Sequence, residues 1–249
     1  MRIALIGTGN LAIHLVKAFE KCPQIECVQW IGRRATPPIT SHKTPYFAKY
    51  QHDTQTDICL IAVSDDAIPS IAKELKDTDA LVAHTAGAVS IKALETIPRK
   101  GVFYPLQSFI QHHAIDWNKI PICLEAENQD DMQMLKSLAH LLSKEVHEIS
   151  EQQRLHLHTA AVFANNFCNH LLNTSQQITT KAEVPFSLLH PLISETFKRV
   201  LAYQASQIQT GPAKRNDLKT QEKHLSILSE KEAELYRILS QSIFNTHNS

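Results

Sequence analysis

The chain of 249 residues is long enough for one or two domains. Its 25 basic side chains balance its 25 acidic ones, so no net field favours nucleic acid or an anionic membrane surface. A hydrophobic fraction of 43% is sufficient for a buried core, and no apolar stretch approaches the roughly 20 residues that a membrane-spanning helix requires. We therefore expect a globular protein that binds neither nucleic acid nor a membrane.

The first dozen residues carry the most informative motif. A short apolar run at 2–6 leads into Gly7-Thr8-Gly9-Asn10-Leu11-Ala12, and apolar residues at helical spacing follow. A buried strand, a glycine turn and an amphipathic helix in this order make a G-x-G-x-x-A dinucleotide fingerprint. The helix N-terminus would offer free N–H groups to the phosphates, and the bare backbone of Gly9 would let them approach. An ordinary strand–helix turn is the alternative interpretation; we predict a nucleotide site at Gly7, Gly9, Asn10 and Leu11.

The second strand, expected at 25–31, indicates which dinucleotide binds. Sites that prefer NAD place a carboxylate about 20 residues after the glycines, where it contacts the ribose hydroxyls. Here the strand runs into Gly32-Arg33-Arg34, with two guanidinium groups and no acid. A guanidinium binds a 2′-phosphate through paired, charge-assisted hydrogen bonds, whereas a carboxylate would repel it. We therefore predict NADP(H), with Arg33 as the main phosphate contact and Arg34 against the adenine; two arginines in a solvated loop are the alternative.

Strands and helices continue to alternate along the first half of the chain. The segment 45–50 is a weak strand or a short helix, and the expected order after it is strand 58–63, helix 67–75, strand 80–84, helix 90–97 and strand 101–104. This alternation predicts a doubly wound, mostly parallel sheet, which binds ligands outside the carboxyl ends of its strands. The residues expected near the dinucleotide are therefore Val63 and Ser64, and those near its nicotinamide end are His84, Thr85, Gly87, Pro105 and Gln107.

The chain changes character near residue 150. A strand at 120–125, a helix at 129–142 and a strand at 145–149 extend the first domain, and Ser150-x-x-Gln153 is a capping box that opens a long helix to about residue 180. Only helices are expected after it, at 185–207, 217–228 and 231–243, the last opened by a second capping box at Ser229 and Glu232. We predict an α/β fold with two domains: an NADP-binding Rossmann domain at 1–150, followed by an all-α domain for substrate binding and dimerisation at 151–249.

The long helix carries the polar side chains most suited to chemistry. His158, Val162, Asn165 and Asn166 are spaced so that they share one face. The two asparagines lie among apolar residues, so we expect them to be buried, and buried amides need hydrogen-bond partners. A substrate or cofactor could supply those partners, or neighbouring helices could, and His158 has the same alternatives. In the stretch 210–217, Arg215 either anchors an anionic substrate group or bridges helices.

The cysteines and histidines indicate whether disulfides or a metal site are to be expected. The five cysteines are scattered, form no C-x-x-C pair and mostly sit in apolar runs, which predicts reduced thiols in a cytoplasmic protein. The 14 histidines include His112-His113 and His156-x-His158, but neither pair has the i, i+3 or i, i+4 spacing with which one helix face binds a metal. We therefore expect no metal site, and a solvated loop at His112-His113.

Four further stretches, together with the fingerprint, suggest a family. They are Gly101–Phe109 (GVFYPLQSF), Ala161–Leu171 (AVFANNFCNHL), Pro191–Thr196 and Gln209–Asp217 (QTGPAKRND). Over nearly its whole length the chain resembles the Rossmann-like proteins with a C-terminal domain of unknown function numbered 2520. Their architecture is similar to that of pyrroline-5-carboxylate reductase and the β-hydroxyacid dehydrogenases. The resemblance implies an NADP oxidoreductase with a Rossmann domain, a helical domain that dimerises, and an active-site cleft between them.

One position departs from that resemblance. The β-hydroxyacid dehydrogenases carry a catalytic lysine in a K-x-x-x-N pattern on this helix; Asn166 would match the asparagine, but Val162 stands at the lysine. Because valine cannot transfer a proton, either His158, one turn earlier, or His84 would have to do so, and histidine suits this role near neutral pH. An imine substrate needs less acid assistance than a carbonyl compound, which would favour a pyrroline-carboxylate-like reaction.

These observations lead to one prediction and one alternative. We predict an NADP(H)-dependent oxidoreductase that transfers hydride to or from a small carbonyl or imine compound in the cleft between the domains. The candidate catalytic residues are His158, Asn166 and His84, and the candidate substrate ligands are Gln107, Asn165 and Arg215. The short helices after residue 185 need an apolar partner surface, so we also predict a homodimer. The alternative is a non-catalytic NADP-binding sensor or assembly protein.

Overall fold

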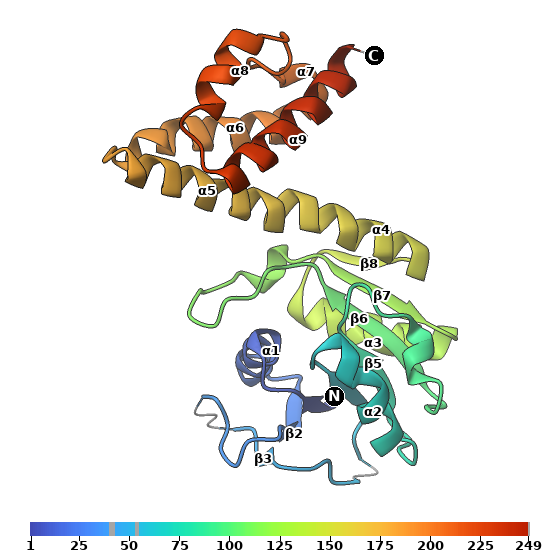
Figure 1. Cartoon of the computed structure of the whole chain (residues 1–249). Helices are drawn as coiled ribbons and strands as arrows, with labels where there is room; N and C mark the ends of the chain where they lie inside the picture. The colour runs from blue at the N-terminus through green and yellow to red at the C-terminus, as the bar shows by residue number, and fades with distance from the viewer. Residues whose placement is uncertain (40–42, 53–54, 249) are drawn as a thin grey trace. The chain divides into compact units, whose positions relative to one another are not determined.

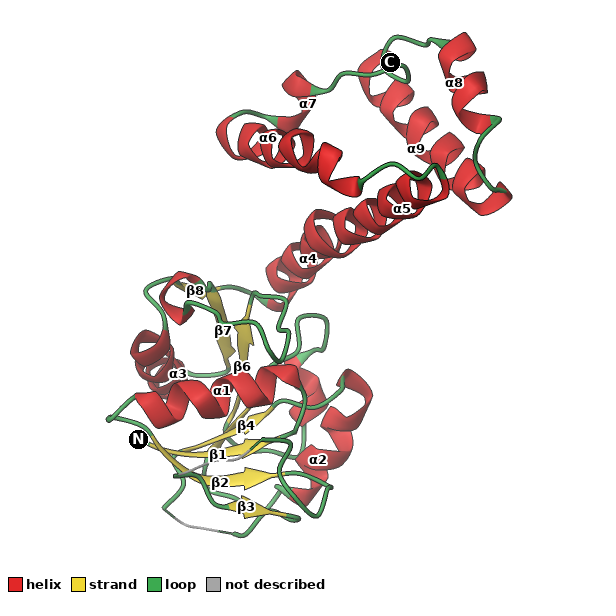
Figure 2. Ribbon diagram, turned by 90° about the vertical axis from the view of Figure 1, so that its left-hand side faces the viewer, coloured by secondary structure: helices red, strands yellow, loops and turns green. Residues whose placement is uncertain are grey.

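The protein consists of two compact units, Met1–Phe163 and Ala164–Ser249. The computed structural model describes residues 1–39, 43–52 and 55–248. Figure 2, coloured by secondary structure, shows that the strands gather in the first unit and that the second is built from helices. The boundary expected after residue 150 precedes helix α4 (Glu151–Ala161), which belongs to the first unit.

Eight strands of the described residues form one sheet, in the order β3-β2-β1-β4-β5-β6-β7-β8 (Figure 1). Their bounds are β1 Arg2–Ile6, β2 Glu26–Ile31, β3 Tyr46–Phe47, β4 Ile58–Ile61, β5 Leu81–His84, β6 Lys100–Pro105, β7 Ile122–Ala126 and β8 Val146–Glu148. Neighbouring strands are parallel except for β6 and β7, which pair antiparallel. The doubly wound, mostly parallel sheet is confirmed. Its strand order reverses between β1 and β4, where such sheets open a ligand-binding crevice.

Helices cover both faces of this sheet, because alternate side chains of a buried strand point to opposite faces. Helix α1 (Asn10–Lys21) and helix α3 (Gln129–Leu142) pack in one apolar core that includes Leu5 of β1. Helix α2 (Ile68–Glu74) packs in a second core that includes the next residue of that strand, Ile6. The continuous apolar runs of the sequence are thus explained by strands that are buried on both faces.

A buried charge holds α4 on the sheet. The side chain of Arg154 is 1% exposed, and its Nη2 donates to Glu125 Oε2 on β7 at 3.0 Å. Its Nη1 donates to three backbone oxygens of the loop after β5, those of Ala86, Gly87 and Val89, at 3.1, 3.0 and 2.7 Å. A guanidinium removed from water in this way must be paired, so the loop and the helix fix each other.

The second unit contains helices and turns in its described part. Its helices are α5 Cys168–Lys181, α6 His190–Ala202, α7 Ala205–Ile208, α8 Leu218–Leu225 and α9 Glu230–Asn248. The side chain of Asp217 caps α8, as expected, by accepting a hydrogen bond from the Thr220 N–H at 3.1 Å. Within this unit Lys181 pairs with Glu232 at 2.7 Å, which joins α5 to α9. None of the helices in the described ranges is both long and apolar enough to cross a membrane.

The helical expectations are confirmed in some places and wrong in others. The capping box of Ser150 and Gln153 forms with both of its bonds. The long helix, however, contains a π-helical segment at Val162–Phe167, which an apolar pattern read at α-helical period does not reveal. The helix expected at 90–97 is only a 3₁₀ turn at Ile91–Leu94, and the helix expected at 185–207 is divided into a 3₁₀ turn, α6 and α7.

We predict that Arg154→Ala lowers the free energy of unfolding of the first unit by about 3 to 5 kcal/mol, because it leaves Glu125 and three carbonyl groups without their donor. Urea unfolding followed by tryptophan emission measures this unit, since both tryptophans, Trp30 and Trp117, lie in it. Lys119→Ala, which breaks an exposed pair with Asp116 in the same unit, is the control and should cost less than about 1 kcal/mol. Equal effects of the two substitutions would contradict this account of α4.

Candidate functional site

The glycine turn after β1 has the two properties that a phosphate-binding turn needs. Gly7 has φ +132°, and a Cβ there would lie 2.0 Å from the backbone oxygen of Ala62, so only glycine fits. Gly9 is different, because a Cβ there would meet no protein atom within 4 Å. Its backbone is extended, a conformation open to any residue. Packing within the protein therefore does not explain Gly9, whereas a phosphate group lying against the start of α1 would.

A pocket of about 800 Å³ opens in front of this turn, at the carboxyl ends of β1 and β4. Eight of the nine residues predicted to bind the cofactor line it: Gly7, Gly9, Asn10, Leu11, Arg33, Val63, Ser64 and Thr85. Sequence reasoning missed other lining residues, among them Thr8, Lys49, Tyr50, Ser70 and Glu74. Lys49 and Tyr50 follow β3, a strand of two residues that is too short to give a clear sequence signal. The pocket has the size of ordinary ligand and cofactor sites.

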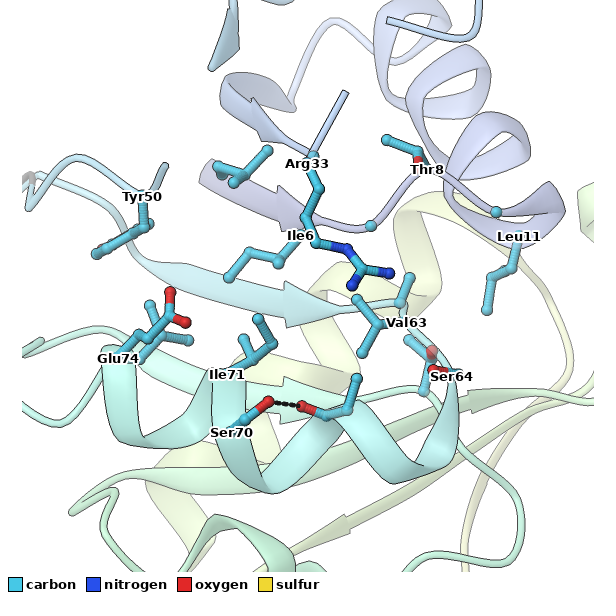
Figure 3. A pocket seen from close by; sticks show the side chains of 18 of the residues that line it. Ile6, Thr8, Leu11, Arg33, Tyr50, Val63, Ser64, Ser70, Ile71 and Glu74 are labelled. Atoms are coloured by element: carbon cyan, nitrogen blue, oxygen red, sulfur yellow. Dashed lines mark hydrogen bonds between the residues drawn. The ribbon is translucent and has the colours of Figure 1, made fainter. Parts of the chain in front are cut away.

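The two arginines after β2 differ in their surroundings. The Arg33 side chain reaches into the pocket, with Val63 and Ser64 on the opposite wall (Figure 3). It is exposed and forms no ion pair with any residue in the described ranges, so its charge is available to a ligand. Arg34 does not line the pocket; its backbone oxygen accepts a hydrogen bond from the Tyr46 hydroxyl at 3.1 Å. Its contact with an adenine stays a prediction.

The first residue of α1 has two roles. Asn10 lines the pocket with the N-terminal turn of the helix. Its side-chain amide meanwhile donates to the backbone oxygen of Phe109 at 2.9 Å. The helix that faces the expected pyrophosphate therefore also holds the loop that follows β6, which carries Gln107. Gln107 itself is exposed, and its Oε1 accepts a hydrogen bond from the Ser108 N–H at 2.8 Å.

A tyrosine–histidine pair lies at the carboxyl end of β6. The Tyr104 hydroxyl is 2.9 Å from Nδ1 of His158 on α4, and the rings meet edge to face. Burial is the main cause that raises the pKa of Tyr104 to about 12. Gly87 makes room for the pair, because a Cβ at this position would lie 2.5 Å from His158 Nδ1 and 2.8 Å from Tyr104 Cζ. Sequence reasoning missed Tyr104, although it is the penultimate residue of β6, at the edge of the sheet where ligands are expected.

The second candidate histidine is in a different environment. His84 is fully buried, and its Nδ1 accepts a hydrogen bond from the Ala86 N–H at 3.2 Å. Burial, and after it the positive charge of Arg154, lowers the pKa of His84 to about 4. The imidazole is therefore neutral at pH 7 and out of reach of solvent. His158 is half-buried, so it is the better placed of the two to meet a substrate.

The remaining candidates lie in the second unit. Asn165 and Asn166 are exposed, so the expectation that they are buried is wrong. They belong to the π-helical segment, and the apolar neighbours on which the expectation rested, Phe163 and Phe167, are themselves exposed. Arg215 is exposed as well, in the turn before α8. Their roles in substrate binding stay predictions.

The described residues contain no cluster of three or more His, Cys, Asp or Glu side chains arranged to hold a metal ion. The thiols of Cys27, Cys59 and Cys123 are buried, and Cys22 and Cys168 are half-buried. Burial raises the pKa of Cys27 to about 12 and that of Cys59 to about 11, so these thiols are not reactive at neutral pH. His112 and His113 are exposed.

With the site described, the chain can be compared with known proteins. The family model for a domain of unknown function, DUF2520, matches residues 120–243. A protein of Bacteroides fragilis, named provisionally as an NADP oxidoreductase, is 32% identical; the match covers 98% of each chain with a TM-score of 0.88. The chain belongs to the DUF2520 family. No curated protein matches it.

More distant structures share the fold of this DUF2520 protein. A protein of Thermotoga maritima is 21% identical, with a TM-score of 0.79 over 99% of this chain and 100% of its own. The pyrroline carboxylate reductase of Plasmodium falciparum, solved with NADP bound, is 13% identical, with a TM-score of 0.62 over 98% of each chain. Identities this low show the fold alone, a Rossmann sheet followed by helices.

We predict that His84 makes the DUF2520 protein less stable in acid. Because folding lowers the pKa of His84 from 6.5 to about 4, the unfolded chain binds this proton more tightly. The stabilisation is complete above pH 6.5 and is lost as the pH falls toward 4, with a total of up to about 3 kcal/mol. Urea unfolding between pH 4 and 7 should show a steeper pH slope for the wild type than for His84→Asn. His113→Asn, at an exposed histidine, should keep the wild-type slope, and identical slopes in all three proteins would contradict the prediction.

Proposed function

We propose that this protein is an NADP(H)-dependent oxidoreductase that reduces, or forms, a small carbonyl or imine compound. The observation that carries the proposal is the open cradle at Gly9, in front of the N-terminus of α1. No protein side chain fills this space, and the helix N–H groups that face it suit a pyrophosphate. When bound, the dinucleotide supplies the hydride, and the protein supplies binding, orientation and the proton.

Arg33 supports NADP(H) over NAD(H). Its guanidinium enters the pocket from the end of β2, the strand end that contacts the adenosine ribose in dinucleotide folds. The acidic lining residues, Asp65 and Glu74, lie after β4 and on α2 rather than at the end of β2. A 2′-phosphate at the end of β2 would therefore meet a cation and no carboxylate from that strand.

His158 is the residue that we propose delivers the proton, with Tyr104 as its positioning residue. A phenol whose pKa is about 12 keeps its proton at neutral pH, so the Tyr104 hydroxyl stays uncharged and holds His158 Nδ1 by a hydrogen bond. To deliver a proton the ring acts as imidazolium: Nδ1–H donates to the Tyr104 oxygen, and the proton on Nε2 passes to the substrate, which leaves a neutral imidazole. Gly87 borders this tyrosine–histidine pair, and Thr85, two residues earlier, lines the pocket proposed for the cofactor. One short loop therefore contacts both the pair and the pocket.

The class of substrate and the oligomeric state are inferred from residues outside the pocket. Val162 in place of a lysine favours an imine, which needs less acid assistance than a carbonyl compound. Asn166, Asn165, Arg215 and Gln107 are the side chains that we propose bind it. The second unit exposes large apolar side chains, among them Leu188, Leu192, Leu201 and Ile227, and we propose that a second copy of the chain covers them. A cytoplasmic location remains a prediction.

A non-catalytic NADP-binding sensor is the second candidate, and Val162 is the observation that favours it. Such a protein would keep the cradle and Arg33 while lacking the proton donor of its catalytic relatives. The two candidates differ in turnover, because only an enzyme oxidises NADPH when cyclic imines and small ketoacids are supplied. Absence of turnover across that panel, with NADPH binding intact, would favour the sensor.

Arg33→Ala should weaken NADPH binding roughly 10- to 100-fold and leave NADH binding nearly unchanged, because only NADPH carries the 2′-phosphate. Calorimetric titration of both cofactors gives the ratio of their affinities. Arg34→Ala is the matched control: a contact with the adenine would affect both cofactors equally and leave the ratio as it is. If Arg33→Ala does not change the ratio, the assignment of the phosphate site is wrong.

His158→Ala should lower kcat roughly 100-fold or more with the substrate found in the panel, because the positioned proton donor is lost. Tyr104→Phe should leave KM nearly unchanged and move the pH profile of kcat, because it removes the hydrogen bond that fixes the imidazole. His156→Ala, two residues away on the same helix, is the control; its Nδ1 contacts the backbone oxygen of Gln152, and its activity should be unchanged. Full activity of His158→Ala would exclude this proton donor without affecting the cofactor site.

A further inference from the structure

A second hollow, of about 390 Å³, lies on the flank of α1, away from the glycine turn. One wall is the face of α1 that carries His14, Lys17 and Lys21, and the other is the segment 111–117. Five ionisable side chains line it, and all are basic: His14, Lys17, Lys21, His112 and His113. Nothing in the proposed function uses these residues.

The wall formed by the loop after β6 is held in place by α1. Asn10 and His14 are one helical turn apart and contact successive residues of this loop. Asn10 Nδ2 donates to the backbone oxygen of Phe109 at 2.9 Å, and His14 Nε2 lies 2.9 Å from the backbone oxygen of Ile110. His14 is only 5% exposed, and its ring lies 5.5 Å from that of Phe109. Phe109 in turn contacts Trp117, which lines the hollow, at 5.7 Å between ring centroids. The hollow is thus a packed feature of the fold.

The positive charge of the hollow is not neutralised by its surroundings. Among the residues that the structure describes, no carboxylate lines it, and neither Lys17 nor Lys21 forms an ion pair. The acidic residues of the two wall segments are engaged elsewhere. Glu20 accepts a hydrogen bond from the Lys43 N–H, and Asp116 accepts one from the Asn118 N–H and lies 3.6 Å from Lys119. In a chain with no net charge, this is a local concentration of cations.

We infer that this hollow binds a small anion with two or more negative charges, of the phosphate or polycarboxylate class. Two lysines four residues apart on one helix face can both reach such an anion, and the imidazoles opposite offer N–H donors. Trp117 and Ile115 give the hollow an apolar part, against which the carbon atoms of a ligand can pack. The volume is at the lower end of the range for small-molecule sites, which suits a compact ligand. The inference does not depend on the proposed function.

Calorimetric titration at low ionic strength tests this site, with inorganic pyrophosphate and citrate as separate probes. We expect the wild-type chain to bind at least one of them with a Kd below about 1 mM, and the stronger binder identifies the ligand class. Lys17→Ala combined with Lys21→Ala should weaken this binding roughly tenfold or more, and His112→Ala combined with His113→Ala should weaken it less.

The matched control is Lys219→Ala combined with Lys223→Ala, two exposed lysines with the same spacing on α8, and it should bind as the wild type does. Pyrophosphate could also enter the pocket at the glycine turn, but that binding would survive the substitution of Lys17 and Lys21. If neither probe binds, or if all binding survives that substitution, the inference is wrong. Helical circular dichroism of each variant verifies that α1 is intact.

Discussion

The guanidinium of Arg154 is the interaction on which the arrangement of the first unit depends. It lies at the start of α4, out of water, and its charge is met by Glu125 and by three carbonyl groups of the loop after β5. That loop begins with Thr85 and Ala86, which line the pocket at the glycine turn, and continues to Gly87, whose missing side chain leaves room for His158. His158 lies four residues after Arg154, on the same side of the helix. One buried cation thus sets the distance between the pocket and the imidazole, and it also helps to keep His84 neutral.

The sequence was sufficient for the parts of the fold that depend on neighbouring residues. Gly7 and Gly9 follow a buried strand and precede a helix, and this order alone predicts the turn. The capping box at Ser150 and the cap at Asp217 are equally local, since each is a bond between residues three apart. The carboxyl-edge rule then correctly placed Val63, Ser64 and Thr85 at one pocket, because parallel strands bring their ends together whatever their separation in the chain.

Contacts between distant segments could not be predicted from the sequence, because they depend on how those segments pack. Tyr104 and His158 are separated by 54 residues, and neither pattern nor composition pairs them. The same holds for Asn10 and Phe109, so the loop on the flank of α1 could not be foreseen. Asn165 and Asn166 were expected to be buried because of their apolar neighbours. That inference assumed that these neighbours face a core, but Phe163 and Phe167 are themselves exposed.

The π-helical segment also bears on how positions along the long helix are counted. In an α-helix the residue one turn before Asn166 is Val162, but a π turn closes over five residues, which moves that position toward Ala161. Both are aliphatic. Whether the turn before Asn166 is counted as α-helical or π-helical, the residue one turn ahead is therefore not ionisable. The absence of a lysine at this position does not depend on how the helix is aligned. Proton transfer beside this asparagine would therefore need a donor on another element or on an earlier turn.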